Sequence, residues 1–326
     1  MRVTVRAPAR LHFGFIDLDG TMGRMFGSIG LAISEPQVIL EVARAHRLLV
    51  EGDERARAAA LAQRFLGHYR VREGVRISIK ETIPAHVGLG SGTQLALSVA
   101  AALTRLFSIK ADVRELAAVM QRGNRSGIGV GVFEHGGLIV DGGRPVRATA
   151  SLNDPSPPPP TIVRHPFPKD WTFVVATPHV VRGLAGNAER RAFRRLPIRS
   201  AARVGRLCRS LLMQMLPALL ERDAVAFGRS LTVIQRIVGS WFRDVQGGVF
   251  ATPQGAEITR LMSRAGAVGV GQSSWGPTVY GMVADEDRAR LVSRRLRKAL
   301  EGRIEATVFL ANGHNRGAGI RMASGR

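Results

Sequence analysis

The feature that most constrains this chain is a glycine-rich loop between an alternating segment and an amphipathic one. Pro84 ends the alternating segment, and Gly88, Gly90 and Gly92 then fall within five residues. Glycine has no Cβ, so such a loop can adopt positive φ and approach a ligand closely. The first turn of a helix leaves N–H groups unpaired and partly positive, which favours phosphate. The pattern alone also fits an ordinary strand-to-helix connection.

A strongly basic composition limits the classes of partner. The chain has 47 basic and 25 acidic residues, a formal net charge of +22, and only four lysines, which leaves 43 arginines. The arginines are spread over every segment, without the interleaved aromatic residues of a single-strand nucleic-acid platform. Non-specific attraction to polyanions at low salt follows from the charge. A site for small polyanions accounts for this balance equally well, and no specific nucleic-acid partner is predicted.

Apolar content and cysteine usage are typical of a globular protein. Hydrophobic residues make up 45% of the 326 positions, enough for a core, and no apolar run is long enough to span a bilayer. The first residues alternate between polar and apolar, unlike a secretory leader. The single cysteine, Cys208, lies in an apolar helical run and excludes an internal disulfide framework. We expect a cytoplasmic protein with no membrane partner.

The order of expected elements predicts two α+β domains. Before the glycine loop, the periodicity predicts strands at 2–5, 38–42 and 75–79 and a helix over 54–70. Asp112 and Glu115 form a predicted capping pair for a further helix. The prolines of 151–160 remove amide donors, so this segment marks the boundary between domains 1–160 and 161–326. The second domain has the element order of a small split βαβ unit, with expected strands at 171–177 and 303–309 and helices at 255–265 and 287–300.

The segment 7–33, between the first two expected strands, combines polar residues and glycines that a structural loop does not need together. It carries Arg10, His12, Asp17, Arg24 and Ser28, interspersed with apolar residues that can anchor it. Its five glycines indicate a chain path folded closely on itself or on a ligand. We expect an irregular loop that lines a substrate. A β-hairpin loop with charges facing water is the alternative.

Three motifs in a fixed order resemble the signature motifs of the GHMP superfamily of small-molecule kinases: PARLHFG at 8–14, PAHVGLGSGT at 84–93 and VGQSSWGP at 270–277. The resemblance implies an N-terminal domain like the second domain of ribosomal protein S5 and a ferredoxin-like C-terminal domain. It also implies that the loop at 84–93 wraps a phosphate chain. Kinases of the mevalonate type carry an aspartate shortly after the position of Ser126, whereas this chain has Ile128, Gly129 and Val130. The second serine of the middle motif is replaced by Gly92.

Longer segments resemble a narrower family, the β-ribofuranosylaminobenzene 5′-phosphate synthases of methanopterin biosynthesis. The resemblance rests on 10–30, 124–143, 182–190 and 271–277, and it is weakest across 40–75 and 145–170. It implies that phosphoribosyl pyrophosphate and 4-aminobenzoate are joined with release of carbon dioxide and pyrophosphate. It further implies Mg²⁺ or another divalent cation, no organic cofactor and a homodimer. An ATP-dependent GHMP kinase and a basic nucleic-acid-binding protein are the alternatives, and the sequence does not distinguish 4-aminobenzoate from 4-hydroxybenzoate.

This reaction assigns phosphate and metal roles to residues of the motifs. We expect pyrophosphate to be bound by a set from the middle motif and by two arginines elsewhere: His86, Gly88, Gly90, Ser91, Gly92, Thr93, Arg24 and Arg125. Ser91 and Asp17 are the expected metal ligands. Loop amides, a cation and arginines together stabilise the charge of a departing pyrophosphate.

The same reaction assigns catalytic and substrate-binding roles. His12, Asp17 and Glu134 are the expected catalytic residues, since a carboxylate can stabilise an oxocarbenium-like ribosyl centre. Glu134 fits a structural turn, and His12 fits a buried core histidine, equally well. The expected substrate-binding residues are Arg10, Ser28, Gln272, Ser273, Ser274 and Trp275. The Trp275 ring is either a plane for the aromatic acceptor or a buried structural residue.

Overall fold

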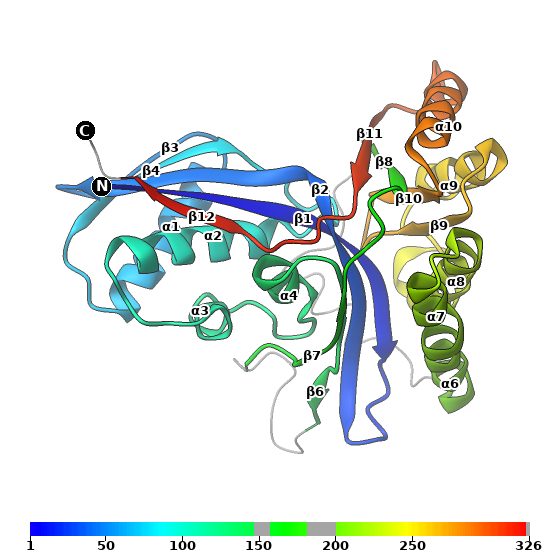
Figure 1. The fold of residues 1–326 in the computed structure, drawn as a ribbon, viewed down its shortest axis with the longest axis horizontal. Coiled ribbons are helices and arrows are strands. Elements are labelled where there is room, and N and C mark those ends of the chain that lie inside the picture. Colours follow the sequence, from blue (N-terminus) through cyan, green and yellow to red (C-terminus); the bar gives the residue numbers. More distant parts are fainter. Residues whose placement is uncertain (147–156, 181–199, 324–326) are drawn as a thin grey trace.

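A long hairpin organises the first sheet of the protein, seen in a computed structural model that describes residues 1–146, 157–180 and 200–323 (Figure 1). Strand β1 (Arg2–Asp17) pairs antiparallel with β2 (Arg24–Ala45). The segment 7–33 is therefore a paired hairpin with register shifts at Pro8/Ala9 and His12/Gly14, and the expectation of an irregular loop is wrong. Apolar side chains such as Leu11 and Leu31 are fully buried along both strands, and this burial stabilises the hairpin despite its glycines.

The remaining strands extend this sheet on both sides of the hairpin. The order is β12-β1-β2-β4-β3, and β5 pairs with the first half of β2. The added strands are β3 (Leu49–Glu51), β4 (Gly74–Glu81), β5 (Leu138–Asp141), β6 (Arg144–Pro145), β7 (Thr161–His165) and β12 (Gly319–Ala323). The alternating sequence at 75–79 predicts a strand, and this strand is β4, which ends just before the glycine loop.

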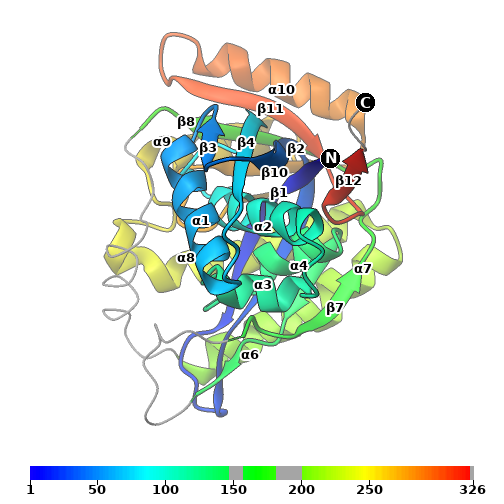
Figure 2. The same ribbon diagram turned by 90° about the vertical axis from the view of Figure 1, so that its left-hand side faces the viewer.

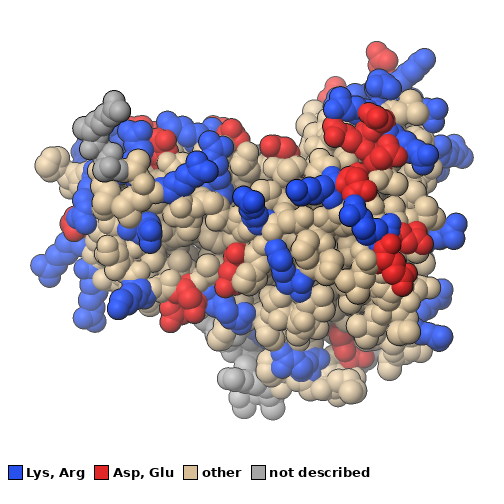
Figure 3. Space-filling view, viewed as in Figure 1, with Lys and Arg blue, Asp and Glu red and all other residues tan. Residues whose placement is uncertain are grey.

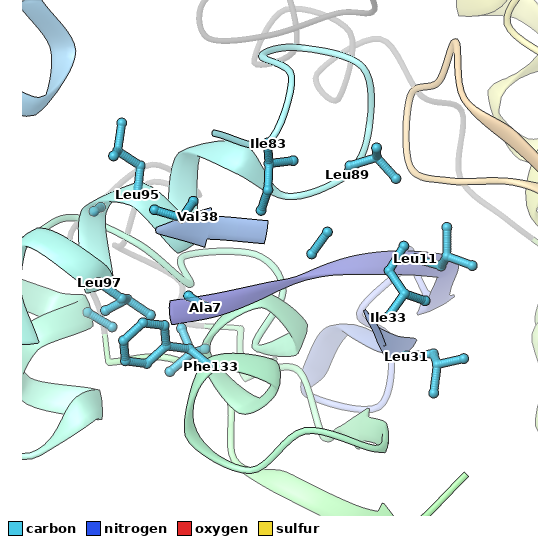
Figure 4. Packing of buried hydrophobic residues seen from close by; sticks show 14 of the residues in the cluster. Ala7, Leu11, Leu31, Ile33, Val38, Ile83, Leu89, Leu95, Leu97 and Phe133 are labelled. Carbon is cyan, nitrogen blue, oxygen red and sulfur yellow. The ribbon is translucent and has the colours of Figure 1, made fainter. Parts of the chain in front are cut away.

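Four helices cover one face of the first sheet (Figures 1 and 2). They are α1 (Arg55–His68), α2 (Ser91–Leu106), α3 (Val113–Val119) and α4 (Ile128–Glu134). The predicted helix over 54–70 is α1, and the predicted capping pair is confirmed, because Asp112 and Glu115 form a reciprocal capping box on α3. Helix α2 packs against β1 and β2 and against the other helices of this layer, so that Leu95 and Leu97 are both buried although they lie on different sides of the helix (Figure 4). This packing fixes where the first turn of α2 lies.

The second sheet is ferredoxin-like. Its strands are β8 (Thr172–Pro178), β9 (Gly269–Gln272), β10 (Val279–Val283) and β11 (Ala306–Asn312), in the antiparallel order β11-β8-β10-β9. Helices α9 (Pro253–Ala265) and α10 (Glu286–Leu300) complete the βαββαβ pattern. The predicted α+β class is confirmed, and the second domain has the ferredoxin-like order that the sequence predicts.

A helical layer precedes β9 and packs against both sheets. It runs through α6 (Ala201–Ser210), a π-helical turn (Leu211–Met215), α7 (Leu216–Leu220) and α8 (Ala224–Gln246). The π turn comes just before Pro217, which cannot donate a helical hydrogen bond. Helix α8 contacts both β9 and β1. It therefore connects the hairpin of the first domain to the second.

The first sheet takes strands from both sides of the expected boundary at residue 160. Strand β7 pairs with β5, and β12, the last described strand, pairs with β1. The described part of the proline segment, 157–160, lies against β5, where Gly142 N–H donates to the Pro160 carbonyl at 2.9 Å. Residues 151–156 and the motif at 182–190 lie outside the described residues.

The basic side chains are distributed rather than gathered. Figure 3 shows lysine and arginine over all parts of one face, with acidic residues between them. None of the helices that the structure describes is long and apolar enough to cross a membrane.

Candidate active site

The three glycine-containing motifs meet at the hydroxyl group of Ser273. This fully buried side chain accepts a hydrogen bond from the His12 backbone N–H at 2.9 Å and donates one to the Gly88 carbonyl at 2.6 Å. The Arg10 guanidinium donates to the same Gly88 carbonyl. One serine thus joins β1, the glycine loop and the turn after β9, which are far apart in sequence.

The glycine loop needs its glycines because it packs directly on that turn. Gly88 has φ +91°, and a Cβ there would overlap the carbonyl oxygen of Ser273. Gly90 has φ +85°, and its Cβ would lie 2.9 Å from Arg10 Cγ. The loop is further held by Arg10 N–H, which donates to the Leu89 carbonyl at 3.1 Å. Left-handed backbone and close approach both exclude larger residues here.

The loop ends by presenting the first turn of α2. Gly90 is the N-cap and has no side chain with which to cap the helix, while Thr93 and Gln94 N–H both donate to its carbonyl. The amides of Ser91 and Gly92 have no hydrogen-bond partner among the described residues. Open amides at the positive end of a 16-residue helix form an anion site. His86, exposed and at φ +61°, lies on the outer part of the loop.

His12 is buried beside this junction. Its side chain Nε2 lies 3.1 Å from Ser126 Oγ, and its ring centroid is 5.0 Å from that of Phe15. Burial, and then the nearby Arg10 charge, hold the pKa of His12 well below its ordinary value of 6.5. The imidazole is therefore neutral near pH 7, and it can accept or relay a hydrogen bond but carries no positive charge.

A buried carboxylate holds the chain next to Ser126. Asp141 accepts hydrogen bonds from Gly127 N–H at 2.8 Å and from Gly143 N–H at 2.9 Å. Burial raises the pKa of Asp141 to about 6, although both hydrogen bonds act in the opposite direction. Ser28, an expected substrate-binding residue, is fully buried and lies opposite Asp141 in the strand register. Ser28 therefore lies beside the carboxylate that holds Gly127.

The turn after β9 closes the other side of His12. Gln272 accepts a hydrogen bond from Ala251 N–H at 2.6 Å and donates to the Ser274 carbonyl at 3.0 Å. Ser274 N–H donates to the His12 carbonyl at 3.2 Å. Trp275 packs edge-on against Phe242 at 4.6 Å and is only 7% exposed. Together with His12 and Phe242 it lines a cavity of about 30 Å³, which is room for a water molecule and not for an aromatic acid.

The far end of the hairpin carries two expected site residues away from the glycine loop. Asp17 accepts hydrogen bonds from Asp19 N–H at 2.8 Å and Gly20 N–H at 3.4 Å, and burial raises its pKa. Arg24 donates to the carbonyls of Gly142 and Gly143, both at 2.9 Å. Asp17 comes five residues after His12 on β1, about 16 Å at the rise of a strand.

The expected metal and catalytic sets are only partly brought together. Ser91 on α2 and Asp17 at the hairpin end do not share one position, and the described residues hold no group of three or more His, Cys, Asp or Glu that could bind a metal ion. Glu134 ends α4, exposed, with its carboxylate 3.4 Å from His135 Nε2. Arg125 is partly buried before α4, next to Ser126.

Comparison with known proteins agrees with this geometry. Residues 55–137 match the GHMP kinases N terminal domain, and residues 215–302 match the GHMP kinases C terminal family. The chain is 36% identical to the β-ribofuranosylphenol 5′-phosphate synthase of Methanothermobacter thermautotrophicus, over 98% of each chain. It is 34% identical to the protein of that name from Archaeoglobus fulgidus, over 98% of this chain and 99% of the relative. The chain belongs to the β-ribofuranosylphenol 5′-phosphate synthase family.

Membership in this family makes the chain an enzyme of the synthase type on a GHMP fold. The family name specifies a phenol, where the motifs predict an aminobenzene, so the two names differ in one ring substituent. Among solved structures, homoserine kinase from Cytophaga hutchinsonii superposes with a TM-score of 0.68 at 18% identity, covering 98% of this chain and 97% of the kinase. That likeness concerns the fold alone.

Several residues around the site were not singled out by the sequence. Asp141 and Ser126 belong to the glycine-dense segment 124–143, and their spacing gives no signal for the contacts they make. Arg57 and Arg122 lie beside Gly92 in the structure. In a chain with 43 arginines, nothing in the local sequence distinguishes these two.

Proposed function

We propose that this chain transfers the ribosyl 5-phosphate group of phosphoribosyl pyrophosphate to 4-aminobenzoate, with release of carbon dioxide and pyrophosphate, as a step of methanopterin biosynthesis. The observation that carries the proposal is an open anion site on α2, combined with apolar residues where related kinases carry their catalytic base. Ile128 and Val130, where related kinases carry an aspartate, are buried apolar side chains. His12 is neutral and buried.

The proposed reaction needs no group that removes a proton from the acceptor. The bond between ribose C1 and the pyrophosphate oxygen breaks, and pyrophosphate takes the electron pair. The carboxyl-bearing ring carbon forms a new bond to C1. The bond from that carbon to the carboxylate then breaks, its electron pair restores the aromatic ring, and carbon dioxide leaves. The electrons balance without a redox partner, so the site must position its substrates and stabilise the departing pyrophosphate.

The residues of the junction supply these two requirements. The amides of Ser91 and Gly92 would receive the pyrophosphate at the positive end of α2. The neutral His12, bonded to Ser126, would hydrogen-bond the ribose or the acceptor without adding charge near a developing ribosyl cation. Asp17 stays a predicted catalytic residue. His86, Arg24 and Arg125 stay predicted to bind pyrophosphate, and Trp275 stays a predicted substrate-binding residue. Glu134, which is exposed at the far end of α4, has no role in this proposal.

Mg²⁺ belongs to the proposal as a partner of pyrophosphate. Mg²⁺ commonly keeps several waters and binds through phosphate oxygens with one or two protein ligands. Ser91 begins α2 beside Arg10, and Asp17 lies seven residues further along β1, so the described residues do not fit a resident ion held between the two. We expect the ion to enter with phosphoribosyl pyrophosphate, and the Ser91 hydroxyl would be available to hold it.

The acceptor is tested by a direct competition. Purified protein is given Mg²⁺, phosphoribosyl pyrophosphate and carboxyl-labelled 4-aminobenzoate or 4-hydroxybenzoate, and labelled carbon dioxide and pyrophosphate are measured. We expect equal amounts of the two products with 4-aminobenzoate. The name of the relatives favours 4-hydroxybenzoate, and release from that acid alone would overturn the choice of acceptor. Ser91→Ala should lower turnover with the fold intact, whereas Ser240→Ala on α8 should not.

The kinase alternative uses the same fold and is tested in the same preparation. Absence of carbon dioxide release from either acid, together with ATP consumption in the presence of a small alcohol, would replace the proposal by a kinase. Absence of both activities, together with salt-sensitive RNA binding, would favour a basic nucleic-acid-binding protein.

A further inference from the structure

Two arginines from separate segments approach the first turn of α2, and a third arginine lies further along one of these segments. Arg57 and Arg64 belong to α1, seven residues apart and so on the same face of the helix, and Arg122 follows α3. A Cβ built on Gly92 would lie 2.5 Å from Arg57 Nη2 and 3.4 Å from Arg122 Nη1. Two guanidinium groups therefore lie against the same turn that presents the open amides.

The positive charge of this cluster is compensated only in part. Among the described residues, Arg57 pairs with Glu54 at 3.1 Å, and no other ion pair to the cluster is found. The Nε atom of Arg122 is buried and has no hydrogen-bond partner in the described part of the chain. Burial, then repulsion from Arg57 and Arg64, lowers the pKa of Arg122 to about 10. Like charges held together in this way are costly, and an anion between them would offset that cost.

The room for this cluster comes from a substitution in the glycine loop. The kinase motif carries a serine at the position of Gly92, and any side chain there would meet Arg57 Nη2. Gly92 does not have positive φ, so its backbone does not require glycine. The absence of a side chain at Gly92 leaves the space that the two guanidinium groups occupy, and a larger residue would make Arg57 move away.

We propose that Arg57 and Arg122 form a cationic subsite that binds a phosphate group of an inorganic polyphosphate, namely the pyrophosphate of the donor or the free product. The identity of the anion rests on the proposed function. The amides of α2 bind one phosphate, and the guanidinium groups bind the next. The two guanidinium groups offer planar, paired donors that match phosphate oxygens, so this subsite recognises charge and geometry without contacts to a base or a sugar.

The affinity of the variant Arg122→Met for pyrophosphate, compared with that of the unchanged protein, tests the subsite. Methionine keeps much of the volume and removes the charge. Titration calorimetry with inorganic pyrophosphate and Mg²⁺ at fixed ionic strength should show at least a tenfold weaker Kd for Arg122→Met. Arg105→Met is the matched control: it removes one charge from the other end of α2, 13 residues and about 20 Å from Gly92, and should change Kd less than twofold.

A second measurement keeps the test valid if folding changes. Loss of one of three repelling charges should raise the melting temperature of free Arg122→Met, while pyrophosphate should raise it less than in the unchanged protein. Equal changes in Kd for Arg122→Met and Arg105→Met would overturn the subsite, even if carbon dioxide is released normally. Tight pyrophosphate binding that depends on Arg122, without carbon dioxide release, would leave the subsite standing and overturn the proposed function.

Discussion

The replacement Ser273→Ala removes the hydroxyl group that links the three motifs by hydrogen bonds. It removes the acceptor of the buried His12 N–H and one of the donors to the Gly88 carbonyl, which keeps Arg10. An unpaired buried N–H costs about 1–3 kcal/mol, and the lost bond to Gly88 about 1 kcal/mol more. We expect the free energy of unfolding to fall by about 3 kcal/mol. For a chain of this length, with an unfolding entropy of about 2 cal/mol/K per residue, that is roughly 4 °C in Tm.

Thermal unfolding followed by circular dichroism, with carbon dioxide release in parallel, measures both consequences of Ser273→Ala. A glycine loop that shifts by about 1 Å should lower turnover by about 100-fold. The control Ser240→Ala removes a hydroxyl that bonds only to the Ile237 carbonyl of its own helix at 2.7 Å, and should change Tm by less than about 1 °C. A Tm and a turnover for Ser273→Ala that match this control would refute the view that Ser273 joins the motifs.

Three further predictions concern backbone and pH. Gly88→Ala should lower the unfolding free energy by at least about 2 kcal/mol, from positive φ and overlap with Ser273, whereas Gly67→Ala in open space on α1 should raise it by about 0.5 kcal/mol; equal urea midpoints would contradict this. Because the folded pKa of Asp141 is raised from 3.8 to about 6, stability should fall by about 3 kcal/mol as pH rises through that window, and Asp141→Asn should flatten this slope in urea titrations at several pH values. Because the folded pKa of His12 is depressed, its contribution to stability is present above pH 6.5 and lost as pH falls below it. His12→Gln should therefore reduce the fall in unfolding free energy below pH 6.5. An unchanged fall would count against a neutral buried imidazole.

The sequence predicts the fold well where periodicity and local chemistry agree. Helix α1, strand β4 and the capping box of α3 follow from alternation, spacing and the pair Asp112 and Glu115. For the segment 7–33 the sequence favours an irregular loop over a β-hairpin, because the middle of the hairpin is buried on both faces and strict alternation disappears. Its glycines also resemble loop glycines. Strands β7 and β12 join the first sheet through pairings distant in sequence, which no local pattern records.

Site residues that belong to a motif can be predicted from the sequence. Site residues that are brought in only by tertiary packing cannot. The glycine loop, His12 and Ser273 were found because each lies in a motif, and the structure brings them together. The contact of Arg57 and Arg122 with Gly92 depends on how α1 and the end of α3 pack against α2. The sequence offers no contrast there, because arginine is abundant in every segment.

The pairing of β12 with β1 sets the order in which this protein can become complete during synthesis. Until the last described strand, Gly319–Ala323, leaves the ribosome, one edge of β1 has its N–H and C=O groups unpaired. A nascent chain of 160 residues lacks both β7 and β12, so its first sheet is unfinished although every glycine-loop residue is already present. Ser273, which donates to the Gly88 carbonyl, is also synthesised late, so the glycine loop gains this support only after the second domain has begun to emerge.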